Sequence, residues 1–217
     1  MILYKFKSLE NFEQITDLLL TNRIYCPTPG QLNDPLEGVL GIDINRSLAG
    51  LTADNKWEKS FRFWDQLQKE INRYRICSFS KSPESVLMWS YYGAGHSGIC
   101  LEIDIERYES NIHAVKYVSD LELVDRSSIL GLLTHKLNAW SHEEEWRWVS
   151  DNNAQHKFLK ADIKSVLVGA GIHQKYIRPV FEICALMDLQ IDIVSFDSGG
   201  EFRRYPLKKG VRWDDIA

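Results

Sequence analysis

The alternation of apolar and polar residues predicts a series of short strands. In the clearest case, residues 99–105, four apolar side chains alternate with Cys100, Glu102 and Asp104. Successive side chains of a strand point to opposite faces of a sheet, so this pattern is typical of a strand with one buried face. Further strands are predicted at Ile2–Phe6, Arg23–Cys26, the segment through Ile76 and Phe79, Ala114–Val118, Glu143–Val149, Val166–Gly169 and Ile191–Phe196.

Apolar residues at helical spacing predict the helices. Residues 9–21 keep four apolar side chains on one face behind Ser8, which can cap a helix. The clearest helix is Asp54–Tyr74, whose apolar residues step by three or four, and this stripe indicates core packing rather than a cofactor site. Further helices are predicted at Ser82–Tyr92, with Pro83 in the first turn, at Ile129–Trp140 and at Pro179–Leu189.

The order of these elements predicts the fold class. Strands and helices are mixed without strict alternation, which favours an α+β fold with a mixed or largely antiparallel sheet flanked by helices. No repeat, low-complexity tract or linker divides the 217 residues, so we expect a single domain over residues 1–217.

Composition narrows the class of protein. With 26 Lys and Arg against 30 Asp and Glu, the net charge of −4 offers no broad surface for nucleic acid, although a local basic groove stays open. The four cysteines are scattered without a C-x-x-C pair, which indicates free thiols and no zinc site. No apolar run approaches 18 residues and no signal peptide is recognisable, so we expect a cytoplasmic protein that does not enter the membrane.

Candidate chemistry is densest between Arg75 and Asp104. This segment combines polar, aromatic and ionisable side chains, among them Ser78, Ser80, Trp89, Tyr91, Tyr92, His96 and Glu102. His96 lies in the glycine-rich turn GAGHSG, where a backbone or ligand can approach closely. A structural histidine and a catalytic one are both compatible with this pattern.

Two other segments add carboxylates. Asn33-Asp34-Pro35, followed by Glu37, is either a rigid turn or a loop that holds an amide and a carboxylate at the mouth of a pocket.

Lys7, on the first strand, is either a solvated charge or a group that binds an anion.

The run Glu143–Trp148 is the third candidate. As a strand it would place Glu143, Glu145 and Arg147 on one face, with the carboxylates about 7 Å apart. Acidic residues are depleted in strands, so the run indicates either an edge strand protected by charge or a site. In a site, one Glu would bind a hydroxyl or transfer a proton, and Arg147 would orient that Glu.

Taken together, these segments resemble the bacterial family known as domain of unknown function 2971. The resemblance spans most of the chain and rests on LYKFKSL, IYCPTPGQLNDPLEG, ICSFSKSPESVLMWSYYGAGHSGICLEID, W-S-H-EEEWR and IKSVLVG. The order of strands, helix and Glu-x-Glu element is also similar in layout to the ADP-ribosyltransferase superfamily.

The layout resemblance implies NAD as a substrate, with Glu143, Glu145 and His96 as catalytic residues. A nicotinamide ring would stack on Trp89 or Tyr92, and a Glu would contact the ribose. Lys7 or Arg147 would hold the pyrophosphate. The remaining substrate-binding candidates are Asn33, Asp34 and Ser80.

Three hypotheses therefore stay open. The first is an NAD-utilising ADP-ribosyltransferase or glycohydrolase, as in a bacterial toxin or antiphage defence effector, with a nucleotide-type small molecule as ligand and a protein or nucleic acid as acceptor. The second is a metal-dependent hydrolase or nuclease that uses Asp34, Glu37, Glu143 and Glu145. The third is a non-catalytic module that binds a ligand or a protein. Under the first hypothesis no metal ligand is assigned, NAD is the possible substrate, and the sequence identifies no cofactor.

Overall fold

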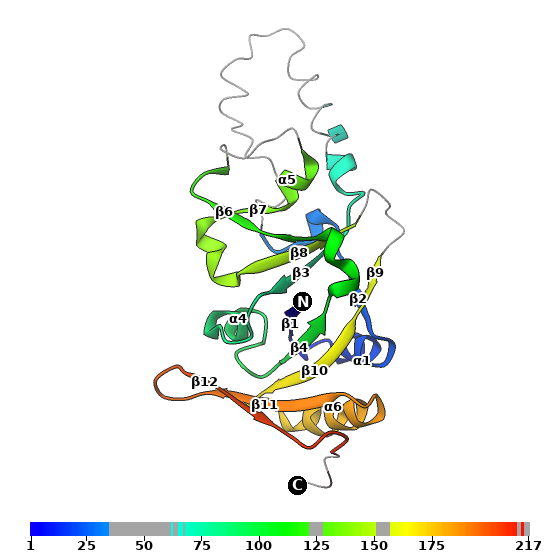
Figure 1. The fold of residues 1–217 in the computed structure, drawn as a ribbon, viewed down its shortest axis with the longest axis vertical. Coiled ribbons are helices and arrows are strands. Elements are labelled where there is room, and N and C mark those ends of the chain that lie inside the picture. Colours follow the sequence, from blue (N-terminus) through cyan, green and yellow to red (C-terminus); the bar gives the residue numbers. More distant parts are fainter. Residues whose placement is uncertain are drawn as a thin grey trace.

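An eight-stranded sheet organises the protein (Figure 1). The computed structural model describes residues 1–34, 62, 65–66, 68–121, 128–150, 157–211 and 214. The sheet has the order β12 (Phe202–Pro206), β11 (Gln190–Phe196), β10 (Asp162–Gly169), β4 (Ile99–Asp104), β1 (Ile2–Lys7), β3 (Ile76–Ser80), β8 (Glu145–Val149) and β5 (Ile112–Ala114). Within it only β10 and β11 run parallel. The predicted α+β class with a mixed, largely antiparallel sheet is confirmed.

Two short ribbons flank this sheet. β2 (Arg23–Tyr25) pairs with β9 (Phe158–Lys160), and β6 (Lys116–Val118) pairs with β7 (His135–Leu137). The predicted helix Ile129–Trp140 is wrong in its second half. Helix α5 covers only Ile129–Leu133, and the chain continues into β7 and the 3₁₀ helix Asn138–Glu143. β7 forms a strand because it pairs in parallel with β6, which is distant in sequence. The spacing of apolar residues within 129–140 cannot predict this pairing.

Three helices cover the two faces of the sheet. α1 (Phe12–Thr21) and α6 (Gln174–Leu186) lie on one side in Figure 1, and α4 (Val86–Tyr91) lies on the other. Asn11 caps α1 in place of the expected Ser8, and its side chain accepts a hydrogen bond from the Gln14 N–H. Helix α4 begins after Ser85, whose hydroxyl accepts from the Met88 N–H, so Pro83 lies outside the helix.

The central strands bury apolar side chains on both faces. Leu3, Leu101 and Val166 pack beneath α1 and α6, while Cys100 and Leu167 pack with α4. In β4 the second face is buried only at Cys100, beneath α4, whereas Glu102 and Asp104 are partly exposed, as expected for a half-buried strand. All four cysteines are free and buried.

The sheet opens between β1 and β3. β1 pairs with β4 along its whole length but with β3 at a single position, Tyr4 opposite Ser80. Beyond this pair the Lys5 ammonium donates a hydrogen bond of 2.6 Å to the Ser78 carbonyl. The Lys5 side chain thus bonds to a β3 carbonyl that a β1 backbone N–H would otherwise bond. The separation of β1 from β3 leaves room for a pocket.

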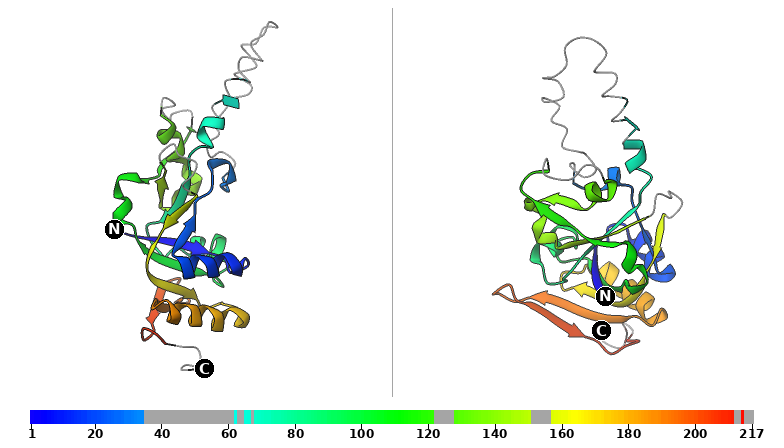
Figure 2. Two further views of the ribbon diagram at one scale, coloured as in Figure 1. Left: turned by 90° about the vertical axis from the view of Figure 1, so that its right-hand side faces the viewer. Right: turned by 45° about the horizontal axis from the view of Figure 1, so that its top comes forward.

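Most of the predicted helix Asp54–Tyr74 lies outside the described residues, although residues 68–71 are helical. Pro35 and Glu37 also lie outside them. Within the described ranges, none of the helices has the length and apolar character needed to cross a bilayer. Figure 2 shows α6, β11 and β12 together at one end of the described fold.

Candidate functional site

A pocket of about 260 Å³ lies where β1 and β3 separate. One part of its wall is polar and the other is aromatic or apolar. The residues that line it are Tyr4, Lys5, Phe6, Gln31, Leu32, Asn33, Ser78, Phe79, Ser80, Met88, Tyr92, Lys136, Glu143 and Glu145. They come from β1, the turn at residues 31–33, β3, α4 and its C-cap, β7, the 3₁₀ helix Asn138–Glu143 and the start of β8, so the pocket joins segments that are far apart in the sequence.

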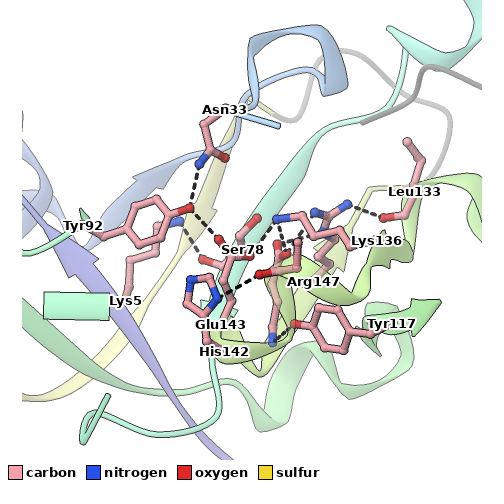
Figure 3. Close-up of polar contacts among 12 residues, drawn as sticks. Lys5, Asn33, Ser78, Tyr92, Tyr117, Leu133, Lys136, His142, Glu143 and Arg147 are labelled. Carbon is pink, nitrogen blue, oxygen red and sulfur yellow. Dashed lines mark hydrogen bonds and ion pairs between the residues drawn. The ribbon is translucent and has the colours of Figure 1, made fainter. Parts of the chain in front are cut away.

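A chain of hydrogen bonds crosses the polar wall (Figure 3). The Asn33 amide donates to the Tyr92 hydroxyl at 2.6 Å, and this hydroxyl donates to Oε1 of Glu143 at 2.5 Å. The Lys136 ammonium donates to Oε2 of the same carboxylate at 2.7 Å. Both oxygens of Glu143 therefore accept hydrogen bonds, one from a neutral hydroxyl and one from a cation.

Lys136 also binds the second carboxylate. Its ammonium lies 2.9 Å from Oε2 of Glu145. Arg147 approaches the same group side-on, with Nε 2.7 Å from Oε1 and a terminal nitrogen 3.0 Å from Oε2. The other terminal nitrogen of Arg147 donates to the Leu133 carbonyl at 2.6 Å. Such a bidentate pair fixes orientation as well as charge, so Glu145 is held rigidly.

A backbone turn brings the two carboxylates together. Glu143 ends the 3₁₀ helix Asn138–Glu143, Glu144 adopts a left-handed conformation with φ of 43°, and Glu145 begins β8. The predicted strand Glu143–Val149 is thus wrong at its start. The turn allows Glu143 and Glu145 to reach one ammonium, whereas a straight strand would hold them about 7 Å apart.

The interpretation of this run as a charged edge strand is also wrong. β8 lies between β3 and β5, so both of its edges are paired. Glu143 and Glu145 are buried, and so is Arg147, which shares a face with Glu145 as expected. Only Glu144 of the three acidic residues is exposed.

Burial and neighbouring charges set the protonation of the site. Burial alone would lower the pKa of Lys136, but Glu145 and Glu143 raise it above its ordinary value. Burial raises the pKa of Tyr92, and the bond to Glu143 raises it further, so the hydroxyl stays protonated and donates. Burial also raises the pKa of Glu145, against the effect of Lys136.

The site holds charges of both signs. Lys5, Lys136 and Arg147 lie in or behind the pocket wall with Glu143 and Glu145, and the nearby buried Asp34 raises the pKa of Arg147 against the effect of burial. Burying ions costs several kcal/mol each unless they are paired. A cluster of this kind beside a cavity is a typical feature of functional sites.

The structure brings most of the predicted site residues together. Asn33, Ser80, Tyr92, Glu143 and Glu145 all line the pocket. Arg147 lies behind Glu145, and Asp34 is buried near Arg147. Lys7, Trp89 and His96 are not among the lining residues.

Trp89 is a core residue that packs against Phe6 behind the pocket wall, and the partly buried His96 contacts Trp89 from the glycine-rich turn. Trp89 is only 1% exposed, and its indole N–H donates to the Pro83 carbonyl at 2.8 Å. The His96 ring lies 4.8 Å from the Trp89 ring and 5.1 Å from that of Phe196, and burial lowers its pKa. Trp89 therefore offers no open face for stacking, and His96 stands apart from the carboxylates.

Sequence reasoning missed Lys136 and Tyr117. Lys136 falls within the predicted helix, and nothing in LLTHKL distinguishes it as the centre of an ion network. The Tyr117 hydroxyl accepts from the Glu145 N–H at 2.8 Å. Of the two lysines on the first strand, Lys5 lines the pocket and Lys7 does not. Ser78, part of the dense polar segment noted in the sequence, hydrogen-bonds with Glu145.

Two of the carboxylates proposed as metal ligands already form ion pairs with basic side chains. Glu143 and Glu145 accept from Lys136 and Arg147. Within the described ranges no three His, Cys, Asp or Glu side chains are grouped to hold a metal ion. The fourth proposed ligand, Glu37, lies outside those ranges.

Comparisons with known proteins add no relative from which a role could be transferred. No family model matches the chain, and no significant match was found among curated proteins or solved structures. The interpretation of the pocket therefore depends on its own geometry.

Proposed function

We propose that this pocket cleaves the N-glycosidic bond of NAD or an NAD-type nucleotide and passes the ADP-ribosyl group to an acceptor or to water. The observation that carries the proposal is the carboxylate of Glu143, held between the Tyr92 hydroxyl and the Lys136 ammonium on the wall of a ring-sized pocket. The layout resemblance to the ADP-ribosyltransferase superfamily favours the same reaction.

The apolar part of the pocket suits a flat ring. Phe6, Phe79 and Met88 supply the apolar part of the lining. Aromatic side chains hold planar groups by offset or edge contacts. A volume of about 260 Å³ lies just below the range of ligand pockets, about 300–1,000 Å³, so one ring with its ribose would enter while the rest of a dinucleotide stays outside.

Glu143 has the properties that glycosidic cleavage requires. As the bond to nicotinamide breaks, positive charge develops on the ribose ring, and a fixed carboxylate stabilises it. A ribose hydroxyl can donate to Glu143 where the Tyr92 hydroxyl donates now.

Glu145 acts on the reaction through its neighbour. Both of its oxygens already accept from Arg147 and Lys136, so it has less capacity than Glu143 to bind a substrate hydroxyl. It fixes the position of Lys136, which in turn orients Glu143. We therefore assign Glu143 as the catalytic carboxylate and Glu145 as a positioning residue.

The test is release of nicotinamide from NAD, with and without a bacterial cell extract as a source of acceptors. We expect Glu143→Gln to reduce the rate by about 100-fold or more, as the loss of one charge-stabilising group does in other enzymes. Glu144→Gln is the matched control, because Glu144 is adjacent and exposed, and it should retain the wild-type rate. Background release by the wild-type protein in both conditions would refute the proposal. Calorimetric binding of NAD without turnover would then favour a non-catalytic module.

A further inference from the structure

A second cavity, of about 500 Å³, lies between α1 and the β2–β9 ribbon. Its wall combines cations, carboxylates, amides and exposed aromatic rings. The residues that line it are Lys7, Asn11, Glu13, Gln14, Ile15, Asp17, Leu18, Arg23, Tyr25 and Phe158. None of these lines the first pocket, and the volume is within the usual range for ligand sites.

Lys7 is a half-buried cation that faces this cavity without a partner. Within the described part of the chain its ammonium makes neither a hydrogen bond nor an ion pair. Burial and the nearby charge of Lys5 lower the pKa of Lys7 to about 8. Lys5, two residues earlier on the same strand face, donates to the Ser78 carbonyl. An unpaired ammonium removed from water is costly, and a bound anion would offset that cost.

Arg23 supplies a second cation at the same cavity. Its guanidinium lies 5.2 Å from the centre of the Phe158 ring. Its ion pair with Asp17 is long, at 3.8 Å, and both side chains are about half exposed. Such pairs contribute little to stability, so Arg23 can turn to a ligand at small cost.

The remaining lining groups suit the other parts of a nucleotide. Tyr25 and Phe158 contact each other edge to face at 5.8 Å and are 44% and 45% exposed, so they offer ring surface to a base. Glu13 and Asp17 can accept hydrogen bonds from ribose hydroxyls. A ligand of phosphate alone would leave these carboxylates and rings unused.

We propose that this cavity is a second ligand site, which binds a nucleoside monophosphate with its phosphate at Lys7 and Arg23, its ribose at Glu13 and Asp17, and its base against Phe158 and Tyr25. The site does not depend on the reaction proposed for the first pocket, because the two cavities share no lining residue.

The test is calorimetric titration with AMP. Lys7→Met and Arg23→Gln should each weaken binding by about tenfold to a hundredfold, the effect of losing one charge-assisted contact. Lys160→Met is the matched control, because Lys160 is exposed and pairs with Arg23 in the ribbon but does not line the cavity. It should bind AMP as the wild type does. Equal affinity of all four proteins, or no binding by the wild type, would overturn the proposal.

Titrations with fragments of AMP and with two further variants test which residues contact each part of the ligand. Adenosine and ribose 5-phosphate should each bind more weakly than AMP, and Phe158→Leu should weaken AMP but leave ribose 5-phosphate unchanged. Glu143→Gln should bind AMP normally. If Glu143→Gln abolishes binding and Lys7→Met does not, AMP occupies the first pocket and the second site is refuted, whatever the outcome of the nicotinamide assay.

Discussion

Lys136 holds two buried carboxylates, and its removal should strongly destabilise the protein. Its ammonium lies 2.7 Å from Glu143 and 2.9 Å from Glu145, and all three side chains are at most 4% exposed. Lys136→Met keeps an unbranched side chain one atom shorter and removes the charge. Breaking a buried ion pair costs about 3–5 kcal/mol because a charge stays behind unpaired. Against a typical stability of about 5–15 kcal/mol, this is a large fraction.

Urea denaturation at pH 7.5 and pH 5 measures the effect. Lys136 lowers the pKa of Glu145, so without Lys136 this pKa should rise further in the folded state, and the loss of stability should be smaller at pH 5, where Glu145 can take a proton. The double variant Lys136→Met/Glu143→Gln should lose less than Lys136→Met alone, because Glu145 still has Arg147. The control Lys69→Met breaks an exposed pair with Asp65 and should cost less than about 1 kcal/mol.

A cost of Lys136→Met below about 1 kcal/mol would refute this account of the network. A double variant whose loss equals the sum of the two single losses would also refute it, since coupled charges must deviate from additivity.

Two further substitutions test the surroundings of the pockets. Lys7→Met should stabilise the protein at pH 7 by about 1–3 kcal/mol, because the folded state lowers the pKa of Lys7 from 10.5 to about 8 and each unit corresponds to about 1.4 kcal/mol. The destabilisation due to Lys7 should fade between pH 8 and pH 10.5, so the stability advantage of the variant over the wild type should shrink over this range; a constant difference between the two proteins in urea melts would contradict it. Gly98→Ala should cost more than about 3 kcal/mol, because its methyl group would lie 2.3 Å from the Lys7 carbonyl and 2.9 Å from that of Gly93. Gly95→Ala, at φ of 63° with open space around it, should cost only about 1–2 kcal/mol, and thermal melts that rank the two the other way would refute the steric argument.

Local spacing predicted the elements whose apolar pattern is strong. The helix over residues 9–21 and the strands at the start of the chain and at residues 99–105 correspond to α1, β1 and β4. β12 escaped prediction because most of its residues are exposed, so no apolar pattern marks it. The predicted helix Ile129–Trp140 failed where β7 pairs with β6, because that pairing depends on a segment about 20 residues away.

The sequence by itself determined which segments carry the candidate chemistry. The NDP turn, the segment around Tyr92 and the EEEWR run were each recognised from their unusual residues. Only the tertiary structure decided that Asn33, Tyr92 and Glu143 meet, across separations of 59 and 51 residues, and that Lys136 joins the two carboxylates. It also placed His96 apart from them. The reason is physical: local spacing determines which residues share a face, but long-range packing determines which faces meet and where two strands separate to leave a pocket.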